Sequence, residues 1–282
     1  MINALTIDVE DYYMVSAFAD RICFADWCRY ESRVERNTHR ILDLMDKHHV
    51  KGTFFVLGWV AEQSPALVRE IQARGHEVAS HGYNHRLVYD LTPEEFRADT
   101  RKSKDILEDI TGYAVEGYRA TSYSIVKRSL WALDILIEEG FRYDSSIFPV
   151  RHDRYGIPGA KRFPHIIRQT AGEIVEFPPT TYPVLGRNIP VAGGGYLRLF
   201  PLSVTRRAIQ RLNSLEKRAA IIYIHPWEID PLQPRLSGTM LSQFRHYINL
   251  NRTFARLDAL LSDFRFSPLN KFMPLSDSCA DE

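Results

Sequence analysis

Short apolar runs alternate with longer amphipathic segments along most of this chain. The runs are rich in Val, Ile and Phe, as in "NALTID" and "GTFFVLG", and both stretches predict strands. Between them, Ile41, Leu44 and Met45 lie near helical spacing within residues 34–50. This alternation favours repeated βα units around a parallel sheet.

Two helices have clear end signals. In "SPALVREIQARG", Ser64 is a natural N-cap, Pro65 suits the first helical position, and Gly75 closes the helix. Residues 92–95, "TPEE", form a capping box, which predicts a helix that runs to about Thr111.

The rest of the chain gives weaker but similar signals. "HEVASH", "AVEGYRA", "FRYDSS" and "AAIIYIHPWE" predict further strands, "SLWALDILIEEG" and "LSVTRRAIQRLNSLEKR" predict helices, and residues 239–262 predict one long helical segment. Residues 149–200 carry many Gly and Pro residues and predict long loops with a strand near "EIVEFPP". With about seven strand candidates, we expect one α/β domain, barrel-like or open, with its chemistry at the C-terminal strand ends.

Charge and composition narrow the class of protein. The 282 residues carry 36 basic and 35 acidic side chains, for a net charge of +1, and no basic block of the kind that follows nucleic acid. A nucleic-acid partner is therefore excluded from the expected functions. The 45% hydrophobic content is enough for one large domain or two small ones.

The cysteines and the N-terminus suggest a compartment. Cys23, Cys28 and Cys279 are odd in number and lack CxxC spacing, so they predict neither a disulfide framework nor a thiolate zinc site. The opening "MINALTIDVED" does not resemble a secretory signal, and no apolar run approaches the roughly 20 residues that cross a bilayer. We therefore expect a cytoplasmic protein without a transmembrane segment.

Histidines and carboxylates follow several predicted strands. His81 and His85 in "SHGYNH" have a spacing that lets two imidazoles converge on Zn²⁺, although a pair of surface histidines has the same spacing. Two such ligands need an anionic oxygen, which the cluster Asp8, Glu10 and Asp11 can supply. Strand alternation places Asp8 and Glu10 on one side and Asp11 on the other, so one carboxylate could bind metal while another acts as general base.

Two further strand ends carry ionisable groups. Arg119 in "YRATSYS" would need a carboxylate partner if buried, or it is an ordinary surface arginine. His225 follows the apolar "AAIIYI" and precedes Pro226. A satisfied core histidine is the usual outcome there, but its place at a strand end favours proton transfer.

Together these segments resemble the polysaccharide deacetylase family with the NodB homology domain, which is carbohydrate esterase family four. "SHGYNH" is similar to its H-[ST]-x-x-H motif, "TIDVED" to a divergent T-F-D-D-G, "GYRAT" to R-x-P, "YDSS" to D-x-S and "IYIHP" to L-x-x-H. The order matches along residues 4–230. "GGGYLRLFP" and "HPWEIDPLQP" resemble the subgroup associated with exopolysaccharide and exosortase loci, whose members are typically cytoplasmic.

The resemblance implies a distorted (β/α)7 barrel, NodB-like, which we expect to be a single domain over residues 1–282 with a family-specific extension over 230–282. It also implies one divalent metal, most often Zn²⁺, and hydrolysis of N-acetyl groups from amino sugars. Position by position, it assigns Asp8 as the catalytic base and Glu10, His81 and His85 as the metal ligands.

The remaining motif residues receive roles in the same way. Arg119 would orient Asp8, and His225 would protonate the leaving amine with its charge tuned by Asp144. A backbone N–H near Ser122 or Tyr123 would stabilise the oxyanion.

Two departures from the family pattern bear on these roles. Thr121 stands where the motif usually has Pro, which predicts a less rigid oxyanion loop. Val9 follows Asp8 where a second Asp is usual, so the metal carboxylate is either Glu10 or Asp11.

The expected substrate is an amino-sugar polysaccharide or its lipid- or nucleotide-linked precursor. Tyr123, Tyr182, Tyr196 and Trp227 fall near the expected mouth and could stack on sugar rings, although most aromatic residues are core. Arg198 could contact an anionic group of a donor, or it is an exposed loop arginine.

Three function classes stay open at this stage. The first is the deacetylase, the second is a cyclic-amide hydrolase of the same fold, similar to allantoinases, and the third is a polysaccharide-binding barrel with weakened catalysis. Packing of the last helix on another subunit is a further alternative, so a homo-oligomer is one expected state.

Overall fold

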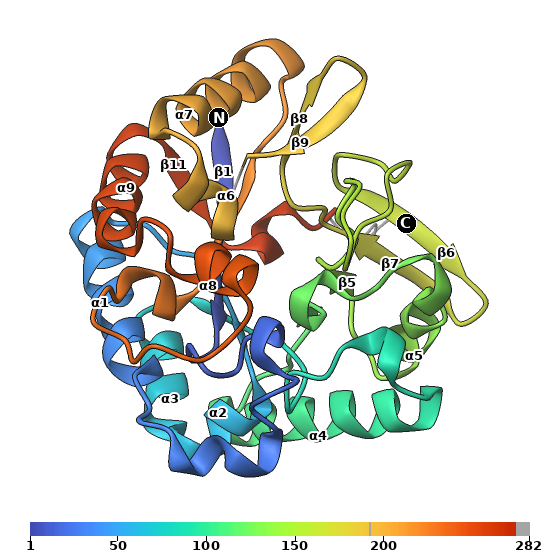
Figure 1. Cartoon of the computed structure of the whole chain (residues 1–282). Helices are drawn as coiled ribbons and strands as arrows, with labels where there is room; N and C mark the ends of the chain where they lie inside the picture. Colours follow the sequence, from blue (N-terminus) through green and yellow to red (C-terminus); the bar gives the residue numbers. More distant parts are fainter. Residues whose placement is uncertain (192, 275–282) are drawn as a thin grey trace.

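A parallel sheet lies at the centre of the molecule (Figure 1). The computed structural model describes residues 1–191 and 193–274. In this part of the chain, seven strands run parallel in the order β10-β1-β2-β3-β4-β5-β7. Their bounds are β1 Ile2–Val9, β2 Thr53–Val56, β3 Glu77–Ser80, β4 Gly117–Tyr118, β5 Tyr143–Asp144, β7 Gly172–Glu176 and β10 Ile221–Ile224.

The two outer strands of this order approach each other. After β7, the amide of Thr180 donates to the carbonyl of Ile221 on β10 over 3.3 Å, and the amide of Ile221 donates to Thr180 Oγ1 over 2.6 Å. These bonds draw the sheet toward closure. The expected α/β fold, a distorted barrel of seven parallel strands, is confirmed.

Four further strands are attached to this core. Their bounds are β6 His165–Gln169, β8 Thr181–Val184, β9 Arg187–Pro190 and β11 Arg265–Ser267. β6 is antiparallel to β7, β8 and β9 form a separate hairpin, and β11 pairs with the start of β1. The expectation of long loops over 149–200 missed β6, β8 and β9, because these strands are short and partly exposed and have no continuous apolar run.

Helices surround the strands (Figure 1). Their bounds are α1 Val34–Lys47, α2 Gly58–Gln63, α3 Pro65–Ala73, α4 Pro93–Thr111, α5 Ala132–Glu138, α6 Gly194–Leu199, α7 Leu202–Arg211, α8 Met240–Tyr247 and α9 Leu250–Asp263. None of the described helices is long and apolar enough to cross a membrane.

The helix-end predictions are confirmed for α4 and only partly for α3. Thr92 and Glu95 form the expected capping box, with the Glu95 amide 3.2 Å from Thr92 Oγ1, and Gly112 follows α4 with a left-handed φ of 72°. Pro65 begins α3 as expected, but the Ser64 side chain makes no cap bond and faces Glu35 instead. Ser64 is at once the last residue after α2 and the residue before α3, with a non-helical ψ of 59°.

The predicted single helix over 239–262 is wrong, because α8 and α9 are separate. Asn249 interrupts the run with a left-handed φ of 52°. Its side-chain amide donates to the carbonyl of Arg198 on α6 over 2.8 Å. A tertiary contact therefore offsets the cost of the break, and Asn tolerates this conformation better than most residues.

Large side chains fill the interior of the barrel. Phe55, Tyr143 and Phe177 are buried against one another, and the guanidinium of Arg119 lies 4.1 Å above the ring of Phe55. A second, larger cluster packs between the sheet and its helices. Since this interior is filled, the polar side chains at the C-terminal strand ends are held at one mouth of the barrel.

The domain limits inferred from the sequence stay a prediction. β10 and β11, from the second half of the chain, both pair with β1. Cys23 and Cys28 are free and exposed, whereas Cys279 lies outside the described residues.

Candidate active site

A buried ion pair links the ends of β1 and β4. Arg119 is fully buried, and its Nη1 donates to Asp8 Oδ1 over 2.6 Å. Its other donors bond the carbonyl and the hydroxyl of Ser145 and the hydroxyl of Thr6. A guanidinium saturated in this way fixes the carboxylate it faces. Arg119 therefore holds one carboxylate oxygen of Asp8.

Three candidate metal ligands converge beside this pair. Ligand atoms of Glu10, His81 and His85 lie within 4.8 Å of one another, and all three side chains are buried. Glu10 follows β1, while both histidines lie in the loop after β3. The loop, and not a helical face, brings the two imidazoles together.

Backbone conformation explains the shape of this histidine loop. Gly82 has a φ of 75° and His85 a φ of 58°, so the chain turns sharply twice within five residues. A Cβ on Gly82 would lie 2.9 Å from a carboxylate oxygen of Asp99, whose Oδ2 accepts the Tyr83 amide over 2.8 Å. The glycine at the motif's second position therefore has a local structural reason.

Two of the three ligands, His81 and Glu10, are oriented by a second partner. His81 Nδ1 lies 2.7 Å from the carbonyl of Arg119, which leaves Nε2 free to face the site. Glu10 Oε1 accepts the indole N–H of Trp227 over 3.0 Å. Burial, partly opposed by Asp8, lowers the pKa of His81 to about 4, so its imidazole is neutral at pH 7, the form that binds metal.

The donor set fits one divalent ion. Glu10 Oε2 lies 2.6 Å from His85 Nε2, yet this buried oxygen has no partner with hydrogen-bond geometry among the described residues. The two atoms are thus close without a hydrogen bond between them, as two ligands of one ion would be. Two imidazoles and a carboxylate, separated by about the span of two bonds of roughly 2 Å, match the N and O ligands that zinc takes.

The third acid of the cluster has a different role. Asp11 Oδ2 accepts the amides of Arg33 and Val34 over 2.6 and 2.9 Å and the hydroxyl of Ser32 over 3.0 Å. The carboxylate therefore caps the N-terminus of α1, where negative charge is favourable. Of the two acids that could complete the metal site, the structure places Glu10 there.

His225 is held by a carboxylate that the motif comparison did not indicate. Its Nδ1 lies 3.0 Å from Glu228 Oε2, and its Nε2 lies 3.7 Å from both Asp8 Oδ2 and Glu10 Oε1. Burial alone would lower its pKa, but the charges of Glu228 and Glu10 outweigh it and raise the pKa to about 9. The imidazole is therefore protonated at neutral pH.

The predicted pairing of His225 with Asp144 needs correction. Asp144 bonds Ser146 and lies against Glu176 on the neighbouring strand β7, and it does not line the pocket. Burial raises the pKa of Asp144 to about 6. Glu228 lies in the turn that follows His225 and bonds its ring, whereas Asp144 on β5 is engaged by Ser146 and Glu176.

Arg198 and Trp227 are more deeply placed than expected. Arg198 is not an exposed loop residue: it lies in α6, is 2% exposed, and donates to Glu228 Oε1 over 2.7 Å and to the carbonyl of His246 over 2.7 Å. Trp227 is 4% exposed and stacks with His225 and with His246. Both side chains therefore support the site from within, and Trp227 offers no open platform for a sugar.

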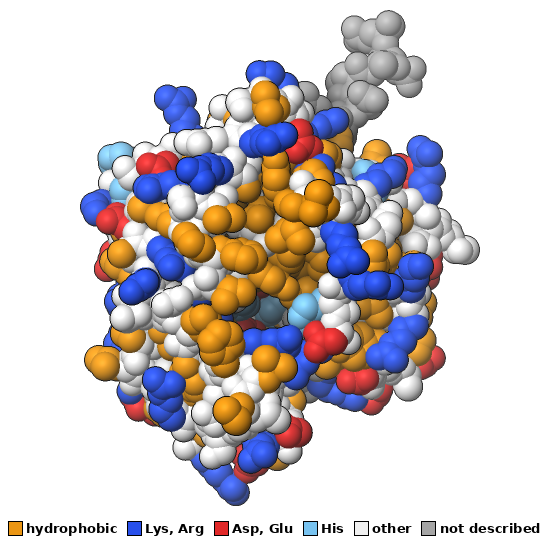
Figure 2. Space-filling model, turned by 45° about the horizontal axis from the view of Figure 1, so that its top comes forward, with side chains coloured by type: hydrophobic (Ala, Val, Ile, Leu, Met, Phe, Trp, Pro, Cys, Tyr) orange, Lys and Arg blue, Asp and Glu red, His pale blue; other side chains and the backbone are white. Residues whose placement is uncertain are grey.

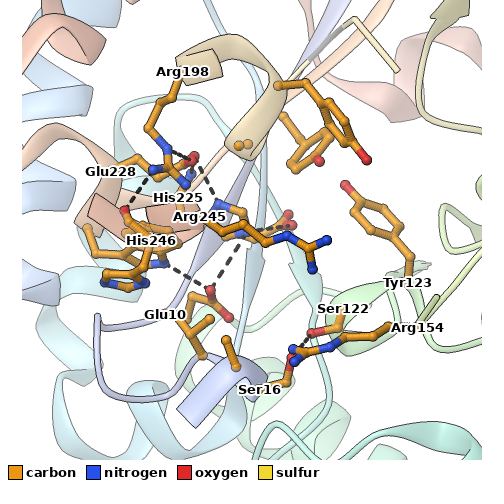
Figure 3. Close-up of a pocket in the computed structure, with 18 of the residues that line it drawn as sticks. Glu10, Ser16, Ser122, Tyr123, Arg154, Arg198, His225, Glu228, Arg245 and His246 are labelled. Atoms are coloured by element: carbon orange, nitrogen blue, oxygen red, sulfur yellow. Dashed lines mark hydrogen bonds and ion pairs between the residues drawn. The ribbon is translucent and has the colours of Figure 1, made fainter. Parts of the chain in front are cut away.

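One cavity of about 380 Å³ is lined by the candidate metal ligands and by Asp8, Arg198, His225 and Trp227 (Figure 3). The space-filling view shows the hollow with a histidine at its edge, below a broad band of hydrophobic side chains (Figure 2). Tyr123 and Tyr196, both expected near the mouth, line the cavity, whereas Tyr182 does not. Tyr123 is 5% exposed, and its hydroxyl has no partner among the described residues.

Sequence reasoning missed several polar residues of this cavity, among them Arg154, Glu228, Arg245 and His246. Glu228 carried a local signal, because its side chain and His225 form a capping box around Pro226. The other three had none, since they come from a loop and from α8.

Comparison with known proteins divides the chain in two. Residues 22–136 match the family model described as polysaccharide deacetylase. Residues 145–274 match a second model, described as a domain of unknown function, DUF3473.

Curated relatives cover the first part. A peptidoglycan-N-acetylglucosamine deacetylase of Bacillus cereus is 36% identical over 98 residues, which are 34% of this chain and 36% of that protein. A chitooligosaccharide deacetylase of Rhizobium leguminosarum bv. trifolii is 33% identical over 112 residues, 34% of this chain and 51% of that protein. The chain thus spans about a third to a half of the length of these relatives.

Solved structures are similar over nearly the whole chain. A "putative polysaccharide deacetylase" from Mycobacterium smegmatis has a TM-score of 0.61 at 22% identity, covering 95% of this chain and 87% of that one. The allantoinase Puue has a TM-score of 0.58 at 15% identity, covering 94% and 85%. At these identities the likeness shows the fold alone.

Proposed function

This chain carries a polysaccharide deacetylase domain, and on that premise we propose that it is a divalent-metal-dependent hydrolase that removes N-acetyl groups from amino sugars. The observation that carries the proposal is the convergence of Glu10, His81 and His85 with Asp8 and His225 at one end of a single cavity. The domain match alone would fit an inactive relative. The intact set of titratable groups favours an enzyme.

Glu10, His81 and His85 would hold the ion, most suitably Zn²⁺. When bound, the ion would supply Lewis-acid polarisation of the acetyl carbonyl. Trp227 and the carbonyl of Arg119 keep two of these ligands in place, because they bond the atoms that do not face the site.

Asp8 is the proposed general base. Arg119 holds its Oδ1, so Oδ2 is left to take a proton from the attacking water. The pair is buried, and the ionised carboxylate is stabilised by the guanidinium it faces.

His225 is the proposed general acid. As the water oxygen adds to the acetyl carbon and the C–N bond breaks, acetate leaves and the amine nitrogen takes a proton from His225 Nε2. Glu228 bonds the opposite ring nitrogen, which sets the ring's orientation and favours its protonated form.

The loop after β4 offers an oxyanion donor. The Tyr123 amide donates to the carbonyl of Ala120 over 3.0 Å, so of the two amides predicted for this role only that of Ser122 is left to meet the developing charge. Ser122 has a φ of 50°, and Thr121, which replaces the motif proline, anchors the loop through its hydroxyl to the carbonyl of Arg86 over 2.7 Å.

The finer parts of this function stay predictions. They are the zinc identity, the role in exopolysaccharide synthesis, the cytoplasmic location, and a homo-oligomeric state. The proposed substrate is a saccharide bearing N-acetylated amino sugars. Tyr123 and Tyr196 are the candidates for contact with its rings.

Acetate release tests the proposal. Full-length chain, stripped with a chelator and reloaded with Zn²⁺, should release acetate from chitooligosaccharides or peptidoglycan only in the loaded form. Asp8→Asn should lower kcat by on the order of 10³, whereas Asp109→Asn, on the exposed face of α4, should not.

Activity of the stripped protein, or an unchanged rate in Asp8→Asn, would overturn the proposal. Hydrolysis of allantoin in place of acetyl amides would favour the cyclic-amide alternative. Saccharide binding without hydrolysis by the loaded protein would favour the binding-barrel alternative.

A further inference from the structure

Two arginines reach into the cavity from segments far apart in the sequence. Arg154 lies in the loop between β5 and β6, and Arg245 lies in the last turn of α8. Both line the cavity that holds Asp8, Glu10 and His225. Figure 3 shows them entering the cavity from opposite sides.

The charges of these two arginines are poorly compensated. Arg154 has no ion pair and no side-chain hydrogen bond among the described residues. Arg245 approaches one carboxylate, that of Asp153, at 3.8 Å, and Asp153 is itself 61% exposed. Arg198, by contrast, already donates hydrogen bonds to Glu228 and to two backbone carbonyls. The positive charge available to a ligand therefore lies at Arg154 and Arg245.

Between the arginines and the candidate catalytic groups there is room for a sugar. The cavity of about 380 Å³ is within the range of small-molecule sites, about 300–1,000 Å³. Tyr155 and Tyr196 line it, with their hydroxyls 3.3 Å apart. An acetamido group at His225 would therefore leave the far end of its sugar beside the two arginines.

We propose that Arg154 and Arg245 form a subsite for a phosphate or diphosphate group attached to the N-acetylated sugar. This inference rests on the proposed function, because it names the substrate class of the same site. Arginine forks match the geometry of phosphate oxygens, and two of them outside the candidate catalytic centre have no other evident task in the described structure. The substrate is thus an activated monosaccharide or short precursor, and not a neutral polymer.

The phosphate could belong to a nucleotide or to a lipid carrier. The cavity rim includes Leu199 and Phe244, 45% and 55% exposed, and Met240 and Leu241 continue the exposed apolar surface along α8. An apolar rim next to a phosphate subsite suits an isoprenoid chain. The experiment therefore includes one arm for each source.

The test compares three substrates that carry the same acetamido sugar. They are a neutral chitooligosaccharide, UDP-N-acetylglucosamine, and a polyprenyl diphosphate-linked N-acetylglucosamine. In the zinc-loaded full chain, the double variant Arg154→Gln/Arg245→Gln should raise KM for the phosphorylated substrates by about tenfold or more, with kcat and the neutral substrate unchanged. Arg252→Gln, an exposed arginine of α9 outside the cavity, is the matched control.

A second variant distinguishes the two sources. Phe244→Ser should raise KM for the lipid-linked substrate alone if the carrier is an isoprenoid. Equal effects on the lipid and nucleotide substrates would assign the phosphate to a nucleotide.

Binding separates this inference from the proposed activity. Inorganic pyrophosphate should bind the wild-type chain in calorimetry and bind the double variant about tenfold more weakly. If no substrate is hydrolysed but this difference is seen, the activity is wrong and the subsite stands. If all three substrates are hydrolysed equally by wild type and double variant, the activity stands and the subsite is wrong.

Discussion

The cavity has two halves that are built differently. The inner half consists of the buried Asp8, Glu10, His81 and His85, which lie at the ends of strands β1 and β3, and the buried Arg119 after β4 holds Asp8 from behind. The outer half comes from a loop and from helices α6 and α8, and it includes His152, Arg154, Tyr155, Leu199, Phe244 and Arg245. Phe244 and Arg245 are about half exposed.

The inner half is also more firmly held than the outer half. Hydrogen bonds fix the side chains of Asp8, Glu10 and His81, and strands β1 and β3 are held on both sides by neighbours in the sheet. The outer groups have few bonds of this kind. Reaction chemistry needs fixed geometry, whereas substrate choice can vary with loops at the mouth. The outer half lies wholly within residues 145–274, which match the domain of unknown function.

The largest expected effect is on stability and contrasts two arginines. Arg119→Lys should lower the free energy of unfolding by about 3–5 kcal/mol, because one ammonium cannot replace the bonds to Asp8, Thr6 and Ser145. Arg245→Lys at the exposed rim should change it by less than about 0.5 kcal/mol. Denaturant unfolding measures the free energy of unfolding of both variants. Equal losses of stability in the two variants would contradict the proposed difference in rigidity between the two halves.

The next effect tests the turn after β10, which reaches the chemistry through His225. Glu228→Gln should reduce kcat by about 10- to 100-fold through His225, and Glu228→Asp should recover part of it. Asp144→Asn, the partner expected from the motifs, should reduce kcat less. Steady-state kinetics of the zinc-loaded variants measures both values of kcat. A larger loss of kcat in Asp144→Asn than in Glu228→Gln would favour the pairing of His225 with Asp144 that was inferred from the sequence.

The last effect concerns the pH dependence of stability. Burial lowers the pKa of His246 to about 3, so the folded chain keeps this ring neutral, whereas the unfolded chain takes up a proton as the pH falls below about 6.5. Because only the unfolded chain gains this proton, His246 does not affect the free energy of unfolding above pH 6.5. Below pH 6.5 it lowers the free energy of unfolding, by more as the pH falls toward 3.

The variant His246→Gln, which can still bond Gln233, should flatten the pH dependence of the unfolding free energy by about 1.4 kcal/mol per pH unit between pH 6 and 4. The exposed His49→Asn serves as the control. An unchanged slope in His246→Gln would mean that His246 is protonated in the folded chain.

The inner half was largely predictable because its signals are local. Apolar runs ended at Asp8, His81, Arg119 and His225, and parallel strands bring such ends to one mouth. The two-residue strands β4 and β5 were found only as parts of longer predicted runs. The outer half was not predictable, since nothing in the sequence near Arg154 or Arg245 says which loop meets α8.

The sequence by itself determined the βα order, the strand ends and a set of residues able to do hydrolytic chemistry, because periodicity and motif order are local properties. Only the tertiary structure decided the partners. It assigned Asp11 to the start of α1 and left Glu10 at the histidines, and it paired His225 with Glu228. In the sequence these carboxylates are chemically equivalent, and they differ only in which N–H groups the folded chain brings within about 3 Å of each.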